Sequence, residues 1–162
     1  MRQVIVGSLL LILGVAALWA AQETPCCVVE TEAITKAVLA ANDKFIQAAN
    51  SMDADAFFET IIGNEPGCII SDGKVYANRE DALVDVRMGF ESVQAMTRTY
   101  DQTHVTVLSA TTALFTGKGK SHVSTYSGRT IDSPFAVSLV FVLKEGQWQV
   151  LHGHFSMPNP RP

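Results

Sequence analysis

The spacing of apolar residues divides the chain into a helical first half and a second half of strands. From Glu30 to Met52, apolar side chains recur at steps of three and four, which is the period of one helix face. These side chains are Ile34, Val38, Ala41, Phe45, Ala48 and Met52. The spacing therefore predicts a long amphipathic helix over 30–52.

Two shorter helices are predicted after it, each with a polar residue in front that suits its N-terminus. Asp53 precedes a helix over Ala54 to Ile62, and Asn78 precedes a helix from about Arg79 to Phe90. The side-chain oxygen of such a cap accepts hydrogen bonds from first-turn amides that have no partner inside the helix. Acidic residues in the first turn of the later helix also favour its positive end.

Strand signals lie between these two helices and after the last one. A hairpin is predicted from Cys68 to Ser71 and from Lys74 to Ala77, joined by the turn pair Asp72-Gly73. Four longer strands follow, near Ala95 to Leu108, Thr112 to Tyr126, Thr130 to Lys144 and Gln147 to Ser156. Their length exceeds that of usual strands, which predicts a curved antiparallel sheet with bulges near Gly117 or Gly119.

The N-terminal segment has the layout of a secretory signal. Arg2 precedes an apolar run from Val4 to Trp19, which ends at the small residues Ala20 and Ala21 before polar residues begin. The run is shorter than the roughly 20 residues of a membrane-spanning helix, and no basic cluster follows it. We expect residues 1–21 to be cleaved and the protein to be secreted or periplasmic; the alternative is a retained anchor.

Without the signal, about 140 residues remain, which is the size of one domain. We expect a linker over 22–29 that contains Cys26 and Cys27, one domain over 30–156, and a tail over 157–162. The net charge of −4 is small, and no basic stripe alternates with aromatic residues. Nucleic acid and acidic membrane surfaces are therefore not expected as partners.

The three cysteines fit an exported protein. In an oxidising compartment, one of the adjacent pair Cys26 and Cys27 could form a disulfide with Cys68, and Cys27 is our candidate. The alternative is that Cys68 is a small buried apolar residue of a strand. Two adjacent cysteines and one distant cysteine lack the spacing of a zinc site.

Several segments carry a family resemblance. Residues 37–55 form a helix followed by an acidic helix start, 72–74 with 78–80 form a turn followed by a capped helix, and 146–156 resemble a closing strand. Together with the element order, they resemble the nuclear transport factor 2-like superfamily, in its SnoaL-like and DUF4440-like branches, over 30–156. The resemblance implies an α+β fold, a cone of three N-terminal helices packed on a curved antiparallel sheet, with a pocket at its open end.

The resemblance also implies two classes of function. The protein would be a small-molecule-binding cone that catalyses proton transfer as an isomerase, cyclase or dehydratase, or a non-catalytic module for ligand binding or protein assembly. No glycine-rich phosphate loop and no nucleophile elbow is present, so no cofactor is expected. Family members commonly pair as homodimers through the sheet, and the strand over Thr130 to Lys144 fits this use because both of its faces are apolar.

Two histidines of the closing strand are candidates for chemistry. His152 and His154 project from one strand face, about 7 Å apart at the backbone. This spacing would suit a metal whose further ligands come from His104, His122 or Asp132. We instead expect a metal-free pocket, because the resemblance favours histidines that form hydrogen bonds there.

A metal-free proton transfer needs a base and a hydrogen-bond donor. The candidate catalytic residues are His154, Tyr126, His152 and Asp132. The candidate ligand-binding residues are Tyr76, Tyr100, His104 and Trp148, of which Trp148 also suits the core. Asp72 is a further possible base, although Asp-Gly is also a turn pair without any chemistry.

Overall fold

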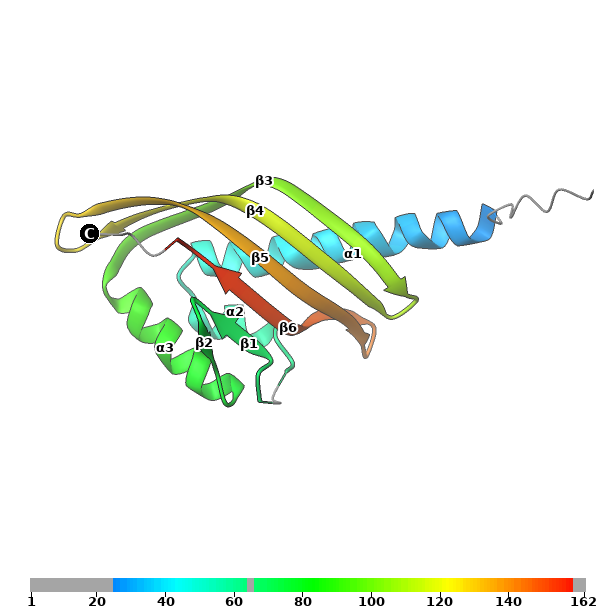
Figure 1. The fold of residues 1–162 in the computed structure, drawn as a ribbon, viewed down its shortest axis with the longest axis horizontal. Helices are drawn as coiled ribbons and strands as arrows, with labels where there is room; N and C mark the ends of the chain where they lie inside the picture. The colour runs from blue at the N-terminus through cyan, green and yellow to red at the C-terminus, as the bar shows by residue number, and fades with distance from the viewer. Residues whose placement is uncertain (1–24, 64–65, 159–162) are drawn as a thin grey trace, which may run out of the picture.

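A long helix lies against the concave side of a curved sheet in this computed structural model, which describes residues 25–63 and 66–158 (Figure 1). The predicted signal over 1–21, the first three residues of the predicted linker and the end of the tail lie outside the described residues, and the rest of the linker, 25–29, belongs to the first helix. The helices are α1 (Pro25–Asn50), α2 (Ala54–Glu59) and α3 (Arg79–Glu91). The strands are β1 (Ile69–Ser71), β2 (Lys74–Val75), β3 (Val93–Ser109), β4 (Thr112–Thr125), β5 (Thr130–Lys144) and β6 (Gln147–Ser156).

The predicted caps start both short helices. Asp53 Oδ1 accepts a hydrogen bond from the Ala56 amide at 3.0 Å, and Asn78 Oδ1 accepts one from the Asp81 amide at 2.8 Å. Helix α2 ends earlier than predicted because the chain after it joins the sheet. Ile61 forms a parallel bridge with Val150, at the edge of β6.

The six strands form one sheet in the order β2-β1-β6-β5-β4-β3. The long strands β3 to β6 pair antiparallel, as predicted. The sheet is nevertheless mixed, because β1 runs parallel to β6. The prediction of a wholly antiparallel sheet was wrong: the hairpin of β1 and β2 lies beside the closing strand, which sequence patterns do not reveal.

A bulge in β3 lies opposite the predicted glycine. The register shifts between Tyr100 and Gln102, and Tyr100 pairs with Gly119 of β4. A Cβ on Gly119 would lie only 1.9 Å from the carbonyl oxygen of Thr99, so only glycine lets the two backbones come this close. The bulge increases the curvature of the sheet around the helices.

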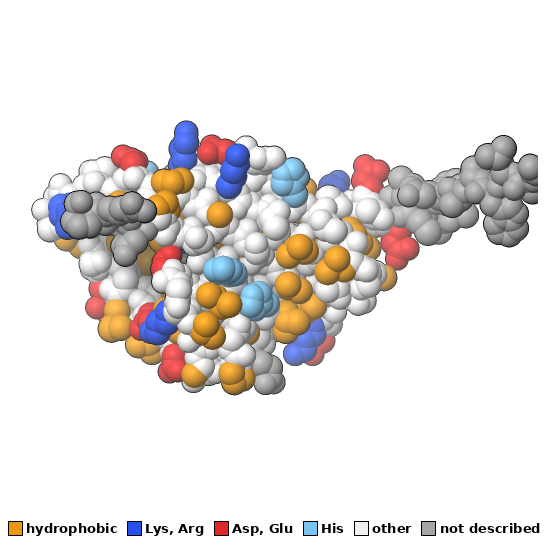
Figure 2. All heavy atoms as spheres, in the orientation of Figure 1, with side chains coloured by type: hydrophobic (Ala, Val, Ile, Leu, Met, Phe, Trp, Pro, Cys, Tyr) orange, Lys and Arg blue, Asp and Glu red, His pale blue; other side chains and the backbone are white. Residues whose placement is uncertain are grey.

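The core lies between the concave face of the sheet and helices α1 and α2. Val38 and Phe45 of α1 and Phe58 of α2 are buried against strand residues such as Phe115 and Leu139. No helix of the described residues covers the opposite, convex face, and Figure 2 shows histidine and apolar side chains exposed together there. None of the helices in 25–63 and 66–158 is long and apolar enough to cross a membrane.

Cys68 is buried just before β1, and its Sγ lies 2.9 Å from the carbonyl oxygen of Gly63. This burial agrees with its alternative role as a small core residue. The side chains of Cys26 and Cys27 lie outside the described residues, so the disulfide with Cys27 stays a prediction.

Candidate functional site

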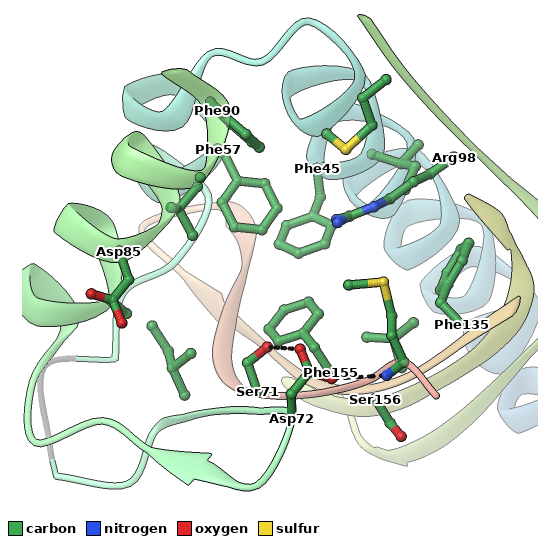
Figure 3. Close-up of a pocket in the computed structure, with 18 of the residues that line it drawn as sticks. Phe45, Phe57, Ser71, Asp72, Asp85, Phe90, Arg98, Phe135, Phe155 and Ser156 are labelled. Carbon is green, nitrogen blue, oxygen red and sulfur yellow. Dashed lines mark hydrogen bonds between the residues drawn. The ribbon is translucent and has the colours of Figure 1, made fainter. Parts of the chain in front are cut away.

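A cavity of about 370 Å³ opens between the concave sheet face and the three helices. Its walls are mostly apolar, with aromatic rings of Phe45 from α1, Phe57 from α2, Phe90 from α3, and Phe135 and Phe155 from the sheet (Figure 3). The rings of Phe45 and Phe57 lie 4.4 Å apart between centroids, and Phe155 stacks on Phe45 at 6.0 Å. An apolar enclosure of this kind suits a small organic molecule.

Strand β3 lines the cavity with Val93 and with three alternating residues that follow it, because alternate residues of a strand point to the same face. Met96, Arg98 and Tyr100 line the cavity, whereas Thr97 and Thr99 are exposed. The strand thus places one cation among apolar walls. Figure 3 shows the Arg98 side chain extending into the cavity toward Phe45.

Hydrogen bonds fix the backbone of Arg98, but its guanidinium makes no ion pair with any described residue. Asn50, the last residue of α1, donates to the Arg98 carbonyl at 3.1 Å and accepts from the Arg98 amide at 2.7 Å. Arg98 Nε is buried, and no residue within 25–63 and 66–158 is its hydrogen-bond partner. Burial lowers the pKa of Arg98 from its ordinary value, because desolvation disfavours the charged form.

Tyr100 provides a phenol at the same wall. Its hydroxyl donates to Asn42 Oδ1 at 3.4 Å, which is long for a hydrogen bond between oxygens. Its ring lies over Gly117, where a Cβ would be 2.6 Å from the ring. Burial raises the pKa of Tyr100 to about 12, so the phenol stays protonated and can donate at neutral pH.

Asp72 lies at the rim of the cavity, in the turn between β1 and β2. Its backbone is left-handed, with φ of 49°. Oδ1 accepts from the Met157 amide at 2.9 Å, and Oδ2 accepts from the Ser71 hydroxyl at 3.2 Å (Figure 3). These bonds fix the carboxylate at the opening, and each oxygen keeps acceptor capacity for a ligand.

A second polar group on the cavity wall connects β2 to α3. The Tyr76 hydroxyl donates to Asp85 Oδ2 at 3.0 Å, and Lys74 forms an ion pair with the same oxygen. The hydrogen bond from Lys74 lowers the pKa of Asp85, and burial raises the pKa of Tyr76. Asp85 is therefore a weak base, and the Tyr76 hydroxyl already donates its hydrogen bond to Asp85.

Two of the predicted ligand-binding residues, Tyr76 and Tyr100, line the cavity. Two others do not: His104 is exposed on the convex face, and Trp148 is half-buried against the core. His104 Nε2 lies 2.7 Å from the side-chain nitrogen of Gln102, its neighbour on the same face.

The predicted catalytic residues do not come together in the cavity. Tyr126 is 73% exposed in the turn after β4. Asp132 is exposed on β5 and lies 2.7 Å from His122 Nδ1. His154 and Asp132 both line a second hollow of about 690 Å³, and His152 lines neither space.

The expected placement of His152 and His154 is corrected by the register of β6. Gly153 pairs with the buried Leu139 and so lies on the concave face, and Phe155 of the same face enters the cavity. The alternating histidines consequently take the convex face. Within residues 25–63 and 66–158, no group of three or more His, Cys, Asp or Glu residues is arranged to hold a metal ion.

Arg98 is the main site residue that the sequence interpretation missed. Its signal was present: an arginine stands between Met96 and Tyr100, at an inward position where alternation favours an apolar residue. Asp85 was also missed, and it carries no sequence signal because acidic residues on a helix usually face solvent.

The curved sheet, the helices on its concave face and the cavity between them define a cone-shaped α+β domain. A family model described as a SnoaL-like domain matches residues 38–160, and the chain belongs to this family. This confirms the SnoaL-like and nuclear transport factor 2-like resemblance; the DUF4440-like branch stays a prediction. No curated protein matches the chain significantly.

Solved structures show the same fold at low sequence identity. A proposed dehydratase of the NTF2-like family from Streptomyces avermitilis has a TM-score of 0.66 and 18% identity, covering 75% of this chain and 94% of its own. A proposed scytalone dehydratase from Novosphingobium aromaticivorans has a TM-score of 0.71 and 9% identity, covering 82% and 89%. An NTF2-like superfamily protein from Salmonella enterica has a TM-score of 0.66 and 12% identity, covering 85% and 96%.

Proposed function

We propose that this protein binds a small, mainly apolar molecule in the cone cavity. The observation that carries the proposal is the aromatic enclosure, with only a few polar side chains at defined places on its wall. An apolar cavity of about 150 Å³ is large enough for benzene. The cavity of about 370 Å³ therefore has room for a ligand with two fused or linked rings.

We further propose that the bound molecule undergoes proton transfer. Asp72 would take a proton from a carbon next to a carbonyl group, and the Tyr100 phenol would donate a hydrogen bond to the carbonyl oxygen as it gains negative charge. Two features support these roles: both side chains line the cavity, and the long bond from Tyr100 to Asn42 is weak enough for a ligand oxygen to compete. Two neighbours of the same fold are named as dehydratases.

A non-catalytic binding module is the second candidate function. Both oxygens of Asp72 already accept hydrogen bonds, which is typical of a carboxylate that fixes a turn. In this case the cavity would only hold its ligand. Both candidate functions include binding of the ligand, and only the enzyme would remove a proton from it.

Binding is tested with N-phenyl-1-naphthylamine, a neutral two-ring dye that fluoresces in apolar surroundings. Val86 lines the cavity, whereas Val84 on the same helix is 51% exposed. Val86→Phe should weaken dye binding by about tenfold or more because it fills the cavity, and Val84→Phe should leave binding unchanged. Equal effects of the two substitutions, with circular dichroism showing both variants folded, would contradict the cavity as the binding site.

Proton transfer is tested with 2-tetralone, a two-ring ketone whose α-protons exchange with D₂O. NMR should show faster exchange with the wild-type protein than in buffer, and Asp72→Asn should abolish the acceleration while tetralone still binds. Wild-type exchange at the buffer rate would leave the binding module as the function.

Export and dimer formation complete the proposal. We propose that the signal is cleaved and that intact-mass measurement of exported protein will give a chain that starts at Ala21 or Gln22. Recovery of the uncleaved chain in the membrane fraction would contradict this.

The exposed convex face, with half-buried Val140 and Val142 on β5, supports a homodimer through the sheet.

A further inference from the structure

Two buried polar side-chain atoms lack a hydrogen-bond partner in the part of the chain that the structure describes, and they lie on adjacent strands. They are Nε of Arg98 and Oγ of Ser121. Arg98 and Ser121 are directly paired across β3 and β4. A buried polar atom without a partner costs free energy and is rare in native proteins. An acceptor group of a bound molecule would give both atoms, on these paired residues, the partner they lack.

The pair lies where the cavity and the second hollow meet. Arg98 lines both, Ser121 lines the hollow, and the two spaces share further wall residues such as Phe155 and Met157. A ligand whose rings fill the aromatic cavity would thus reach the Arg98 guanidinium with its polar end. Asn50 fixes the Arg98 backbone in this place through two hydrogen bonds.

Arg98 is the one Lys or Arg among the residues that line the two spaces, and it is the group with which an anion would pair; Asp72, Asp85 and Asp132 also line them. Arg98 offers N–H donors and no acceptor, and Ser121 can donate one hydrogen bond. Asp72, on the shared wall, is turned to the Met157 amide and the Ser71 hydroxyl and forms no ion pair with Arg98. The planar fork of a guanidinium matches the two oxygens of a carboxylate.

We propose that Arg98 and Ser121 form a carboxylate-binding subsite and that the ligand is a monocarboxylate with an apolar body of about two rings. This inference rests on the proposed binding function and names its ligand class. The carboxylate accepts hydrogen bonds from both side chains and neutralises the buried cation, while the rings contact Phe45, Phe57 and Phe155.

The test compares naphthalene-2-carboxylate with naphthalene-2-carboxamide, which has nearly the same shape but no charge. Calorimetry at pH 7 should show the carboxylate binding to the wild-type protein at least about tenfold more tightly, because hydrogen bonds to a charged group are the stronger kind. Arg98→Met should remove this preference, because the charged carboxylate loses more affinity than the neutral carboxamide. Ser121→Ala should reduce the preference by part of the factor.

Lys120→Met is the matched control. Lys120 precedes Ser121 on β4, is exposed on the convex face, and loses the same charge on substitution. This variant should keep the full preference for the carboxylate. A preference lost equally in Lys120→Met and Arg98→Met would reflect overall charge and overturn the subsite.

The remaining outcomes distinguish a failure of the carboxylate subsite from a failure of the cavity as the binding site. Equal wild-type affinity for both compounds, or an undiminished preference in Arg98→Met, would overturn the subsite and leave the proposed binding function standing. Dye binding that neither compound displaces would also overturn the subsite. If the dye, the carboxylate and the carboxamide all fail to bind, the proposed binding function itself fails.

Discussion

Replacing Arg98 with methionine is expected to stabilise the ligand-free protein. The guanidinium is largely buried, its Nε has no hydrogen-bond partner in the described part of the chain, and burial lowers its pKa, which means that folding costs free energy while the group is charged. Methionine keeps most of the aliphatic stem that packs in the cavity and carries no charge.

The size of the expected stabilisation follows from the Nε donor of Arg98, which no described residue pairs with. A buried polar group without a partner costs about 1–3 kcal/mol, and removing a buried charge in favour of an apolar side chain is neutral or stabilising. Allowing for imperfect packing, we expect the free energy of unfolding to rise by about 1 kcal/mol. For a domain of this size, the melting temperature would rise by roughly 3–5 °C.

The assay is urea and thermal unfolding of wild type, Arg98→Met and Lys120→Met without ligand. The exposed Lys120 variant should stay within about 0.5 kcal/mol of wild type. A loss of stability in Arg98→Met, or a change no larger than that of the control, would refute the reasoning. It would show that the guanidinium has stabilising contacts in the ligand-free protein and is not kept for a ligand.

Three further predictions concern the rest of the fold. Burial raises the pKa of Tyr100 to about 12, so the folded state keeps a proton that the unfolded chain loses near pH 10. The free energy of unfolding should therefore fall as the pH rises between these two values. Urea unfolding should show that Tyr100→Phe flattens this part of the dependence on pH. Gly119→Ala should lower the free energy of unfolding by about 1–3 kcal/mol or more, because the new Cβ meets the Thr99 carbonyl. Gly89→Ala in α3 is the control: its Cβ meets no atom within 4 Å, so the free energy of unfolding should rise by about 0.5–1 kcal/mol. Sedimentation at micromolar concentration should give twice the chain mass, and Val140→Lys on the convex face should give the monomer; a wild-type monomer would contradict sheet-mediated pairing.

The sequence predicted the elements well because their signals are local. The caps at Asp53 and Asn78 and the bounds of β5 and β6 depend on side chains next to the element itself. The parallel pairing of β1 with β6 could not be predicted, because it joins strands that lie far apart along the chain and share no sequence pattern.

The site was harder to predict for a related reason. Alternation shows that His152 and His154 share one strand face, but only pairing with the buried Leu139 decides that this face is the convex one. Arg98 stood at an inward position of a predicted strand and could have been singled out from the sequence. Its significance, however, depends on the absence of an ion-pair partner among the described residues, which only the structure shows.

The central claim is that the cone cavity holds a small apolar ligand, and a crystal structure of the complex with naphthalene-2-carboxylate tests it most directly. The account predicts that the rings lie between Phe45, Phe57 and Phe155, with the carboxylate oxygens in hydrogen-bond reach of Arg98 and Ser121. A ligand bound on the convex face of the sheet, or a cavity closed by its own side chains at saturating ligand, would contradict it.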